Sequence, residues 1–373
     1  PNGLISKAQE AALKTDEATE DEQEALDNAS DYIDEILGGE TATTVAKAKG
    51  GKKYNDTTPI TDDSGDTLYI PGGFKIAEDS ATDIDEGIVI TDGTNEFVWI
   101  PVSSADLNEM YTMVEEPIKL SEVETTTDVY SKLKIENSES YIADIPSSTN
   151  VREPDILKFY DTYSQYYKDT LEYDTIKEMA DAFVLEYKTI YESIKKYGGF
   201  YVGRYELTGS VENPTTQKGK KILTAEIAGN WYELKKSCSN VVDTKYAKSE
   251  MIYGNQWDKV MDWLVDTEEK TYEQVYINSS GWGNFNDSIG NASINSGILQ
   301  VSGKNEFWKS NNIYDLAGNY YEWTQEAYGT TRRIARGGNV DNSGSVQMVS
   351  CRINNPPDYS GSSTSSRTVL YIR

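Results

Sequence analysis

After about residue 265 the chain is rich in glycine, asparagine and serine, and its apolar runs are short. Such a composition does not sustain the three- and four-residue spacing of long amphipathic helices and favours short strands joined by turns. Two helices are predicted before this part, near 174–197 and 255–265, where apolar residues recur at that spacing. Further β-rich runs lie at 68–70, 74–76, 87–91, 96–102 and 200–208. The sequence therefore predicts an α+β fold.

The N-terminal part has a different pattern. Small and apolar residues recur at helical spacing over 5–37, which predicts one long helix. Residues 38–65 are rich in turn-forming residues and predict a linker or a loose hairpin. We divide the chain into a helix and linker over 1–50 and one domain over 51–373, with a large insertion at 103–197. Short helices are expected inside this insertion, at 106–113 and 155–167.

Composition excludes several kinds of site. The absence of histidine and the presence of only two cysteines exclude Ser-His and Cys-His nucleophile pairs, imidazole-ligated metals and iron–sulfur clusters. A formal charge of −27 argues against a nucleic-acid partner. The charge by itself indicates solubility, and the sharper alternative is an extracellular protein that binds calcium. Cys238 and Cys351 could form one disulfide or remain thiols.

The segment NNIYDLAGNYYEWT (311–324) has the strongest local pattern. Its Gly318-Asn319 pair predicts a tight turn with positive φ, and the apolar and aromatic residues around the pair predict burial. Asp315 and Glu322 flank the turn, with backbone carbonyls between them, and hard oxygen ligands of this kind suit Ca²⁺. The alternative is that Glu322 forms an internal salt bridge or hydrogen bonds.

This segment and four others together resemble the formylglycine-generating enzyme, or sulfatase-modifying factor, superfamily. The other four are EFVWIPV (96–102), GGFYVGRYELT (198–208), RRIARGG (332–338) and SRTVLYIR (366–373), so the resemblance covers roughly 67–373. It implies a C-type lectin-like domain. In that family the first segment holds a structural calcium ion. Carried over, the ligands would be the side chains of Asp315 and Glu322 and the carbonyls of Gly318 and Tyr320.

The catalytic residues of that superfamily are missing from this chain. Its copper-dependent oxidases use two cysteines after the R-G-G, where this chain has Asn342 and then Val346 or Gln347. Its iron-dependent sulfoxide synthases need histidines, which this chain lacks. The resemblance therefore implies a non-catalytic scaffold without copper, iron or zinc. An enzyme of altered chemistry, including a carboxylate-only glycosidase, is the alternative.

Residues 339–365 are rich in asparagine, serine, aspartate and tyrosine. They resemble the variable regions of proteins diversified by diversity-generating retroelements, which often have a C-type lectin-like fold. Tyrosine, serine and asparagine suit adaptable binding, as in antibody loops. The resemblance implies a surface for an extracellular protein or glycan, and a merely polar, loop-rich C-terminus is the alternative. The expected ligand-facing residues are Val340, Asp341, Asn342, Val346, Gln347, Ile353, Asn354, Asn355, Asp358, Tyr359 and Ser360.

The opening NGLISKAQEAALKTDEA (2–18) resembles the segment that follows the hydrophobic stem of type IV pilin-like proteins of Gram-positive bacteria. An ordinary amphipathic helix is the alternative. The sequence itself holds no run of 18 apolar residues that could span a membrane. The resemblance therefore implies that a membrane or pilus anchor lies ahead of Pro1. We therefore expect an extracellular protein at the cell surface or on a pilus. A structural pilin or pseudopilin subunit is the alternative function.

Overall fold

The computed structural model describes residues 43–111, 168–174, 176–288, 297–328 and 332–373. Of these, Thr44–Arg373 form one compact unit. The helix expected over 5–37 and the short helix expected near 155–167 lie outside the described residues. Among the described residues, no helix combines the length and the apolar character that crossing a membrane requires.

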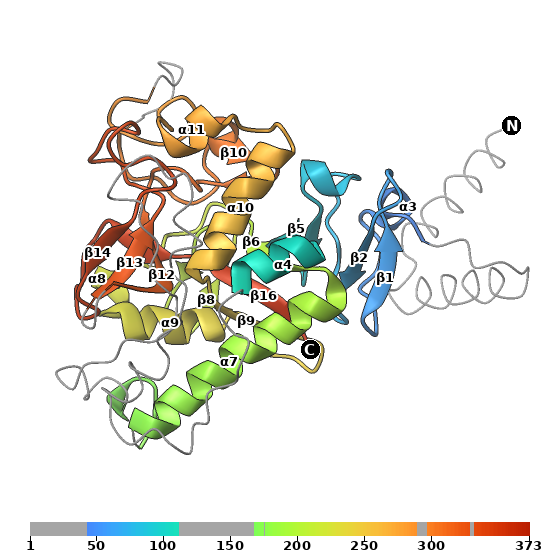
Figure 1. The fold of residues 1–373 in the computed structure, drawn as a ribbon, viewed down its shortest axis with the longest axis horizontal. Coiled ribbons are helices and arrows are strands. Elements are labelled where there is room, and N and C mark those ends of the chain that lie inside the picture. Colours follow the sequence, from blue (N-terminus) through green and yellow to red (C-terminus); the bar gives the residue numbers. More distant parts are fainter. Residues whose placement is uncertain (1–42, 112–167, 175, 289–296, 329–331) are drawn as a thin grey trace, which may run out of the picture. The chain divides into compact units, whose positions relative to one another are not determined.

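The centre of the unit is a six-stranded antiparallel sheet (Figure 1). The C-terminal strand β16 lies between β6 and the edge strand β9, so the last residues of the chain are paired on both sides within the sheet. The segment SRTVLYIR (366–373) thus contributes a strand to this sheet. In spatial order the strands are β3 (Lys75–Ile76), β4 (Val89–Thr91), β5 (Glu96–Pro101), β6 (Gly199–Gly203), β16 (Thr368–Ile372) and β9 (Ala247–Met251).

A second sheet has four strands and carries the C-terminal loops. Its order is β14 (Ile353–Asn355), β13 (Arg332–Arg336), β12 (Tyr321–Tyr328) and β15 (Thr364–Ser366), with β12 and β15 parallel. Three two-stranded sheets complete the β structure of the described residues: β1 (Thr58–Thr61) with β2 (Thr67–Ile70), β7 (Thr208–Gly209) with β8 (Pro214–Thr215), and β10 (Lys309–Ser310) with β11 (Ile313–Tyr314).

Helices α4, α7 and α10 pack on one face of the central sheet. The described α-helices are α3 (Val45–Ala48), α4 (Ser104–Tyr111), α7 (Ile176–Tyr197), α8 (Ala225–Ala228), α9 (Trp231–Ser239), α10 (Gly254–Asp266) and α11 (Tyr272–Tyr276). Alternate residues of a strand point to opposite faces. In β5, Val98 and Ile100 join a core cluster with residues of α4, α7 and α10, whereas Phe97 and Trp99 join a second cluster with residues of β1 and β2.

The α+β fold predicted from the sequence is confirmed. The expected helices near 174–197 and 255–265 are α7 and α10, and the helix expected at 106–113 is α4. The strand expected over 200–208 is shorter, because the chain leaves the sheet after Gly203. The expected linker over 38–65 contains α3 and β1 where it is described. The described ends of the expected insertion belong to the core, since Leu107 and Ile190 are buried in its largest cluster.

Candidate binding face

The turn inside NNIYDLAGNYYEWT has the predicted geometry. Gly318 and Asn319 both have left-handed φ angles, of 76° and 62°. The Gly318 amide donates to the Gly337 carbonyl at 2.7 Å, and a Cβ at Gly318 would lie 2.3 Å from the Asn284 oxygen. The turn is therefore clamped between two other segments, one of them the RRIARGG stretch.

Glu322 forms a fully buried ion pair with Arg367. The two Glu322 oxygens accept hydrogen bonds from Arg367 Nη2 at 2.5 Å and from Nε at 2.8 Å. Asp315 is also buried, and its Oδ2 accepts from the Gly303 amide at 2.7 Å. Burial raises the pKa of Asp315 to about 6, an effect that the Gly303 hydrogen bond and Arg367 oppose.

These contacts bear on the expected calcium ligands. The internal salt bridge of Glu322, which the sequence left open as the alternative, is present. Gly318 lies in the turn, and Tyr320 beyond it is half-buried. Within the described ranges, no group of three or more histidine, cysteine, aspartate or glutamate residues is placed to hold a metal ion. Calcium at Asp315, Gly318, Tyr320 and Glu322 stays a prediction.

The loop 339–347 follows Gly338, whose backbone conformation only a glycine adopts without strain. Gly338 has a φ of 73°, and a Cβ there would lie 2.1 Å from the Gln347 carbonyl oxygen. The loop then closes back on its own start. Val340 is only 4% exposed, so its expected place on the ligand-facing surface is wrong. Val340 is instead buried, and its amide donates to the Asn319 carbonyl at 3.3 Å, which helps to hold the loop against the Gly318-Asn319 turn.

Groups outside this loop hold it through its backbone. Asn286 Nδ2 donates to the Asp341 carbonyl, and the Gly344 amide donates to Asp287 Oδ1, both at 2.9 Å. The Ser279 amide donates to the Gly344 carbonyl at 2.9 Å. Contacts of this kind fix the course of the loop whatever side chain Asp341 or its exposed neighbours carry.

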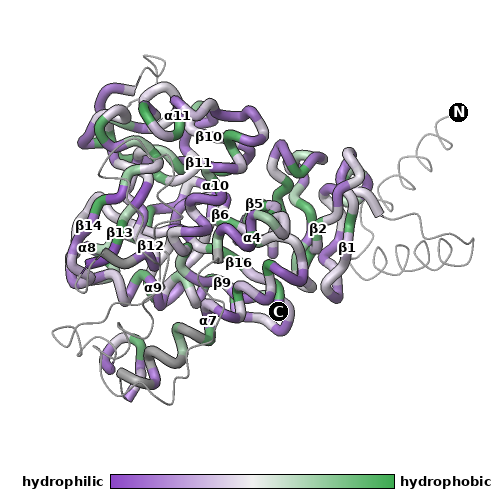
Figure 2. Tube along the Cα trace, viewed as in Figure 1, coloured by the Kyte–Doolittle hydropathy of each residue, from purple (hydrophilic) through white to green (hydrophobic). Residues whose placement is uncertain are grey.

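A second loop, 356–363, is held in the same way. The Trp231 amide donates to the Pro357 carbonyl at 2.9 Å, and the Tyr321 amide donates to the Ser363 carbonyl at 2.9 Å. Asp358, Tyr359 and Ser360 are exposed at its tip. Figure 2 shows the chain around β14, which precedes this loop, mainly in the hydrophilic colours.

Tyr321 lies between the two loops. Its hydroxyl accepts from Asn342 Nδ2 at 3.0 Å and donates to Gln347 Oε1. Burial raises the pKa of Tyr321, and the nearby Asp341 and Tyr359, one from each loop, raise it further. Sequence reasoning assigned Tyr321 to the apolar bulk of its segment. The structure gives it a half-buried ring and a hydrogen-bonding hydroxyl among the expected ligand-facing residues.

We define the binding face as Tyr321 with the exposed or half-buried residues of 339–347 and 356–363. Ile353, Asn354 and Asn355 form β14 and are half-buried beside it, and Asn354 Oδ1 accepts from Arg332 at 3.0 Å. The exposed members among the predicted residues are Asp341, Val346, Asp358, Tyr359 and Ser360, and the half-buried ones are Asn342, Gln347, Ile353, Asn354 and Asn355.

The two cysteines do not form the disulfide that the sequence allowed. Cys238 and Cys351 are free and buried. Burial raises the pKa of Cys238 to about 12 and that of Cys351 to about 11. Because the thiolate is the nucleophile, buried thiols with such pKa values are unreactive at neutral pH.

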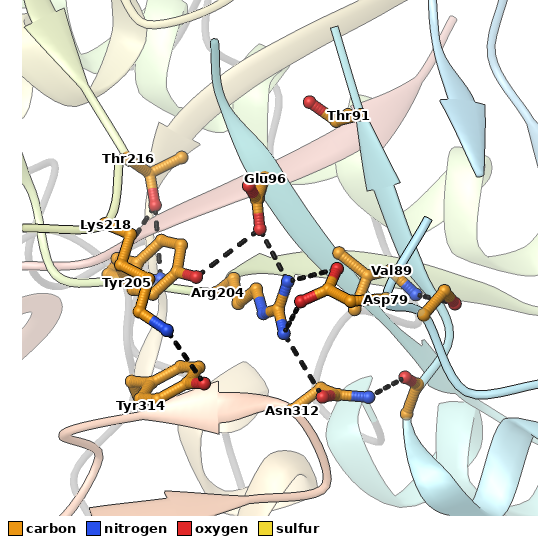
Figure 3. A network of polar contacts seen from close by, with 12 residues as sticks. Asp79, Val89, Thr91, Glu96, Arg204, Tyr205, Thr216, Lys218, Asn312 and Tyr314 are labelled. Carbon is orange, nitrogen blue, oxygen red and sulfur yellow. Dashed lines mark hydrogen bonds and ion pairs between the residues drawn. The ribbon is translucent and has the colours of Figure 1, made fainter. Parts of the chain in front are cut away.

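Away from the binding face, the buried Arg204 connects segments that are distant in the sequence. Arg204, 2% exposed, donates to Glu96 at 2.7 Å and to Asp79 at 2.9 Å, and reaches Asn312 at 3.3 Å (Figure 3). Since Asn312 lies far along the chain from Asp79 and Glu96, this cluster connects the N-terminal strands to the segment that leads into the Gly318 turn.

No family model and no curated protein matches the chain. One solved structure with partial likeness is Treponema denticola variable protein 1, at a TM-score of 0.32 and 14% identity, covering 47% of this chain and 85% of that one. Another is CarF, at a TM-score of 0.34 and 14% identity, covering 47% and 87%. Both likenesses are low in identity and in TM-score, so the α+β fold stands on the structure alone.

Proposed function

We propose that this protein is a non-catalytic ligand-binding protein whose C-terminal loops contact an extracellular protein or glycan. Its domain would be C-type lectin-like and related to the formylglycine-generating enzyme superfamily. In the same proposal the protein is displayed at the cell surface, and a diversity-generating retroelement varies its loops. The lack of histidine and the burial of both cysteines support a binding role over catalysis.

The observation that carries the proposal is that the domain holds the two loops by their backbone and leaves several of their side chains exposed. The Asp341 carbonyl, the Gly344 amide and the Pro357 carbonyl are all held from outside the two loops. The side chains of Asp341, Val346 and Tyr359 are exposed. A scaffold that fixes loops through their backbone allows side chains to change without loss of the fold, which a diversified binding surface requires.

A protein and glycan array probed with the labelled full chain tests the binding role. The face variant is V346S/Y359S, since these side chains are 70% and 42% exposed. The control variant is L185S/Y272S, whose side chains are 64% and 43% exposed outside the face. We expect the wild type and the control to bind the same targets, and the face variant to lose about tenfold in signal.

Three outcomes of the array would contradict the proposal: no bound target, equal binding by the face variant, or equal loss in the control. Diversification has a separate test in the gene's surroundings. We expect a template repeat and a reverse-transcriptase gene nearby, with substitutions confined to exposed positions of 339–365. A locus with neither would remove the retroelement from the proposal and leave the binding role intact.

A further inference from the structure

We infer that the binding face takes a cationic group, an arginine or lysine side chain on the surface of a partner protein. The inference rests on the proposed function and narrows the class of ligand. It follows from the charges of the segments that form the face and from the chain of hydrogen bonds that joins Asp341 to Tyr321.

Three of the segments that form or support the face carry only negative charges. They are 278–288, which holds the first loop, and the loops 339–347 and 356–363 themselves. Their charged residues are Asp287, Asp341 and Asp358, all exposed, and they contain no lysine or arginine. An anionic ligand would therefore meet repulsion without a compensating partner.

The arginines closest in sequence do not offset these charges at the surface. Arg336 and Arg352 are buried and form ion pairs with Asp258 and Glu326 at 2.7 to 3.1 Å. Their charges are neutralised inside the domain. Arg332 beside the face is exposed and donates to Asn354 Oδ1, but the three exposed aspartates outnumber it and set the sign of the potential above the face.

Hydrogen bonds connect an exposed carboxylate to an aromatic ring. Asn339 Nδ2 donates to Asp341 Oδ2 at 3.1 Å, Asn342 Nδ2 donates to Asn339 Oδ1 at 2.9 Å, and Asn342 Nδ2 also donates to the Tyr321 hydroxyl at 3.0 Å. This series of hydrogen bonds fixes the position of Asp341 relative to Tyr321. A guanidinium could then meet a carboxylate and an aromatic ring together, the two groups that arginine recognises best.

A protein partner fits this face better than a nucleic acid or an acidic glycan does. Phosphate, sulfate and sugar carboxylates carry the same sign as the aspartates, and binding them requires clustered lysine and arginine. Arginine is instead a preferred partner of tyrosine at the centres of protein interfaces. Its planar fork also suits a carboxylate such as that of Asp341 or Asp358.

The test uses the full chain and two fluorescein-labelled peptides, one alternating Gly-Ser with arginine and one with glutamate in each arginine position. Fluorescence anisotropy at physiological salt measures their binding. We expect the arginine peptide to bind and the glutamate peptide to show no binding. The D341N/D358N variant should bind the arginine peptide about fivefold more weakly, the loss expected for two partly exposed charge contacts.

The control variant, E78Q/E192Q, removes two exposed carboxylates outside the face and so reaches the same net charge, −25 instead of −27. We expect less than a twofold change for it. A second pair of variants separates the role of the Tyr321 ring from that of its hydroxyl. Tyr321→Phe should keep the affinity for the arginine peptide that the ring supplies, and Tyr321→Leu should lower that affinity.

Equal losses in D341N/D358N and E78Q/E192Q would overturn the inference, since binding would then reflect the general acidity of the chain. So would tight binding of the glutamate peptide, or no binding of the arginine peptide. The array described above keeps this failure distinct from failure of the proposed function. Targets lost only by V346S/Y359S that are neutral or acidic would keep the binding role and reject the cationic ligand.

Discussion

The buried arginine clusters and the binding face use polar side chains in opposite ways. Arg367 is paired inside the protein: Glu322 accepts from two of its donors, and the carbonyls of Gly203 and Tyr314 accept from its guanidinium at 2.9 Å. On the binding face Asp341 and Tyr359 are exposed to solvent. Both regions lie in the same C-terminal part of the chain, so composition does not separate them.

The difference assigns separate roles to residues that are close in sequence. A buried charge must have a partner, because its desolvation costs several kcal/mol. Such a residue therefore specifies the fold, and it tolerates few replacements. An exposed side chain on a loop held by its backbone contributes little to stability and is available for a ligand. Four substitution experiments test this division.

The largest expected effect is that of Arg367→Met. It leaves the Glu322 carboxylate buried without its partner, which should lower the free energy of unfolding by about 3 to 5 kcal/mol. Urea unfolding followed by circular dichroism measures the loss. The control is Arg332→Met, an exposed arginine bonded to Asn354, with an expected change within about 0.5 kcal/mol.

A double variant separates the ion pair from simple packing. Adding Glu322→Gln to Arg367→Met removes the stranded charge, so part of the lost stability should return. If Arg367→Met costs no more than Arg332→Met, the buried pair does not hold this region together and the contrast with the binding face fails.

The next effect is that of Gly338→Ala. A left-handed φ costs a non-glycine residue about 1 to 2 kcal/mol, and overpacking against the Gln347 carbonyl adds about 1 to 3 kcal/mol. Gly219→Ala is the matched control, since its φ of 71° is nearly the 73° of Gly338 and nothing lies within 4 Å of its added Cβ. The loss of unfolding free energy in Gly338→Ala beyond that in Gly219→Ala measures how rigidly the 339–347 loop is held. Equal losses in the two variants would mean that the loop moves to make room for the added methyl group.

Two valines three residues apart give the most direct comparison. Val349 is fully buried in the largest core cluster, whereas Val346 is 70% exposed. We expect Val349→Ala to cost about 2 kcal/mol and Val346→Ala less than about 0.5 kcal/mol, in thermal or urea unfolding. Similar costs at both positions would show that 339–349 is not divided into anchor and contact residues.

Local patterns in the sequence predict much of the fold but little of this division. Helical spacing predicts α7 and α10, and Gly318-Asn319 predicts its own turn, because each signal lies within a few residues. The pairing of Glu322 with Arg367 joins residues 45 positions apart. A single sequence contains no local signal that selects this partner from the 35 basic residues of the chain.

The binding face shows the same limit. Its proposed location at 339–365 rests on composition and on the resemblance to variable regions, whereas the burial of Val340 and the contacts of Tyr321 with Asn342 follow from no local pattern. Both depend on how 278–288 and β12 pack against the loop. The helix α9 was within reach of the sequence, since Trp231, Leu234 and Cys238 are spaced three and four apart and all are buried.

The smallest expected effect concerns a polar cluster that is exposed but not part of the binding face. Glu306 is bonded to Lys218 at 2.8 Å, to the Tyr314 hydroxyl at 2.6 Å and to Lys309 at 3.1 Å, with its side chain 62% exposed. Partial burial raises its pKa, but the hydrogen bonds from Lys218, Tyr314 and Lys309 prevail and lower it to about 2.

A carboxyl group whose pKa is lowered in the folded state stabilises the protein above its unfolded pKa of about 4.3, and this contribution is lost as the pH falls toward 2. We therefore expect Glu306→Gln to cost at most about 1 kcal/mol at pH 7, because solvent screens the exposed Glu306 contacts, and only a small part of that at pH 2, where the folded carboxyl group is about half protonated. Urea unfolding at the two pH values measures the difference, with Glu192→Gln as the exposed control. If Glu306→Gln lowers the free energy of unfolding equally at both pH values, Glu306 acts through packing and not through its charge. Exposed polar residues outside the binding face would then also contribute to the fold.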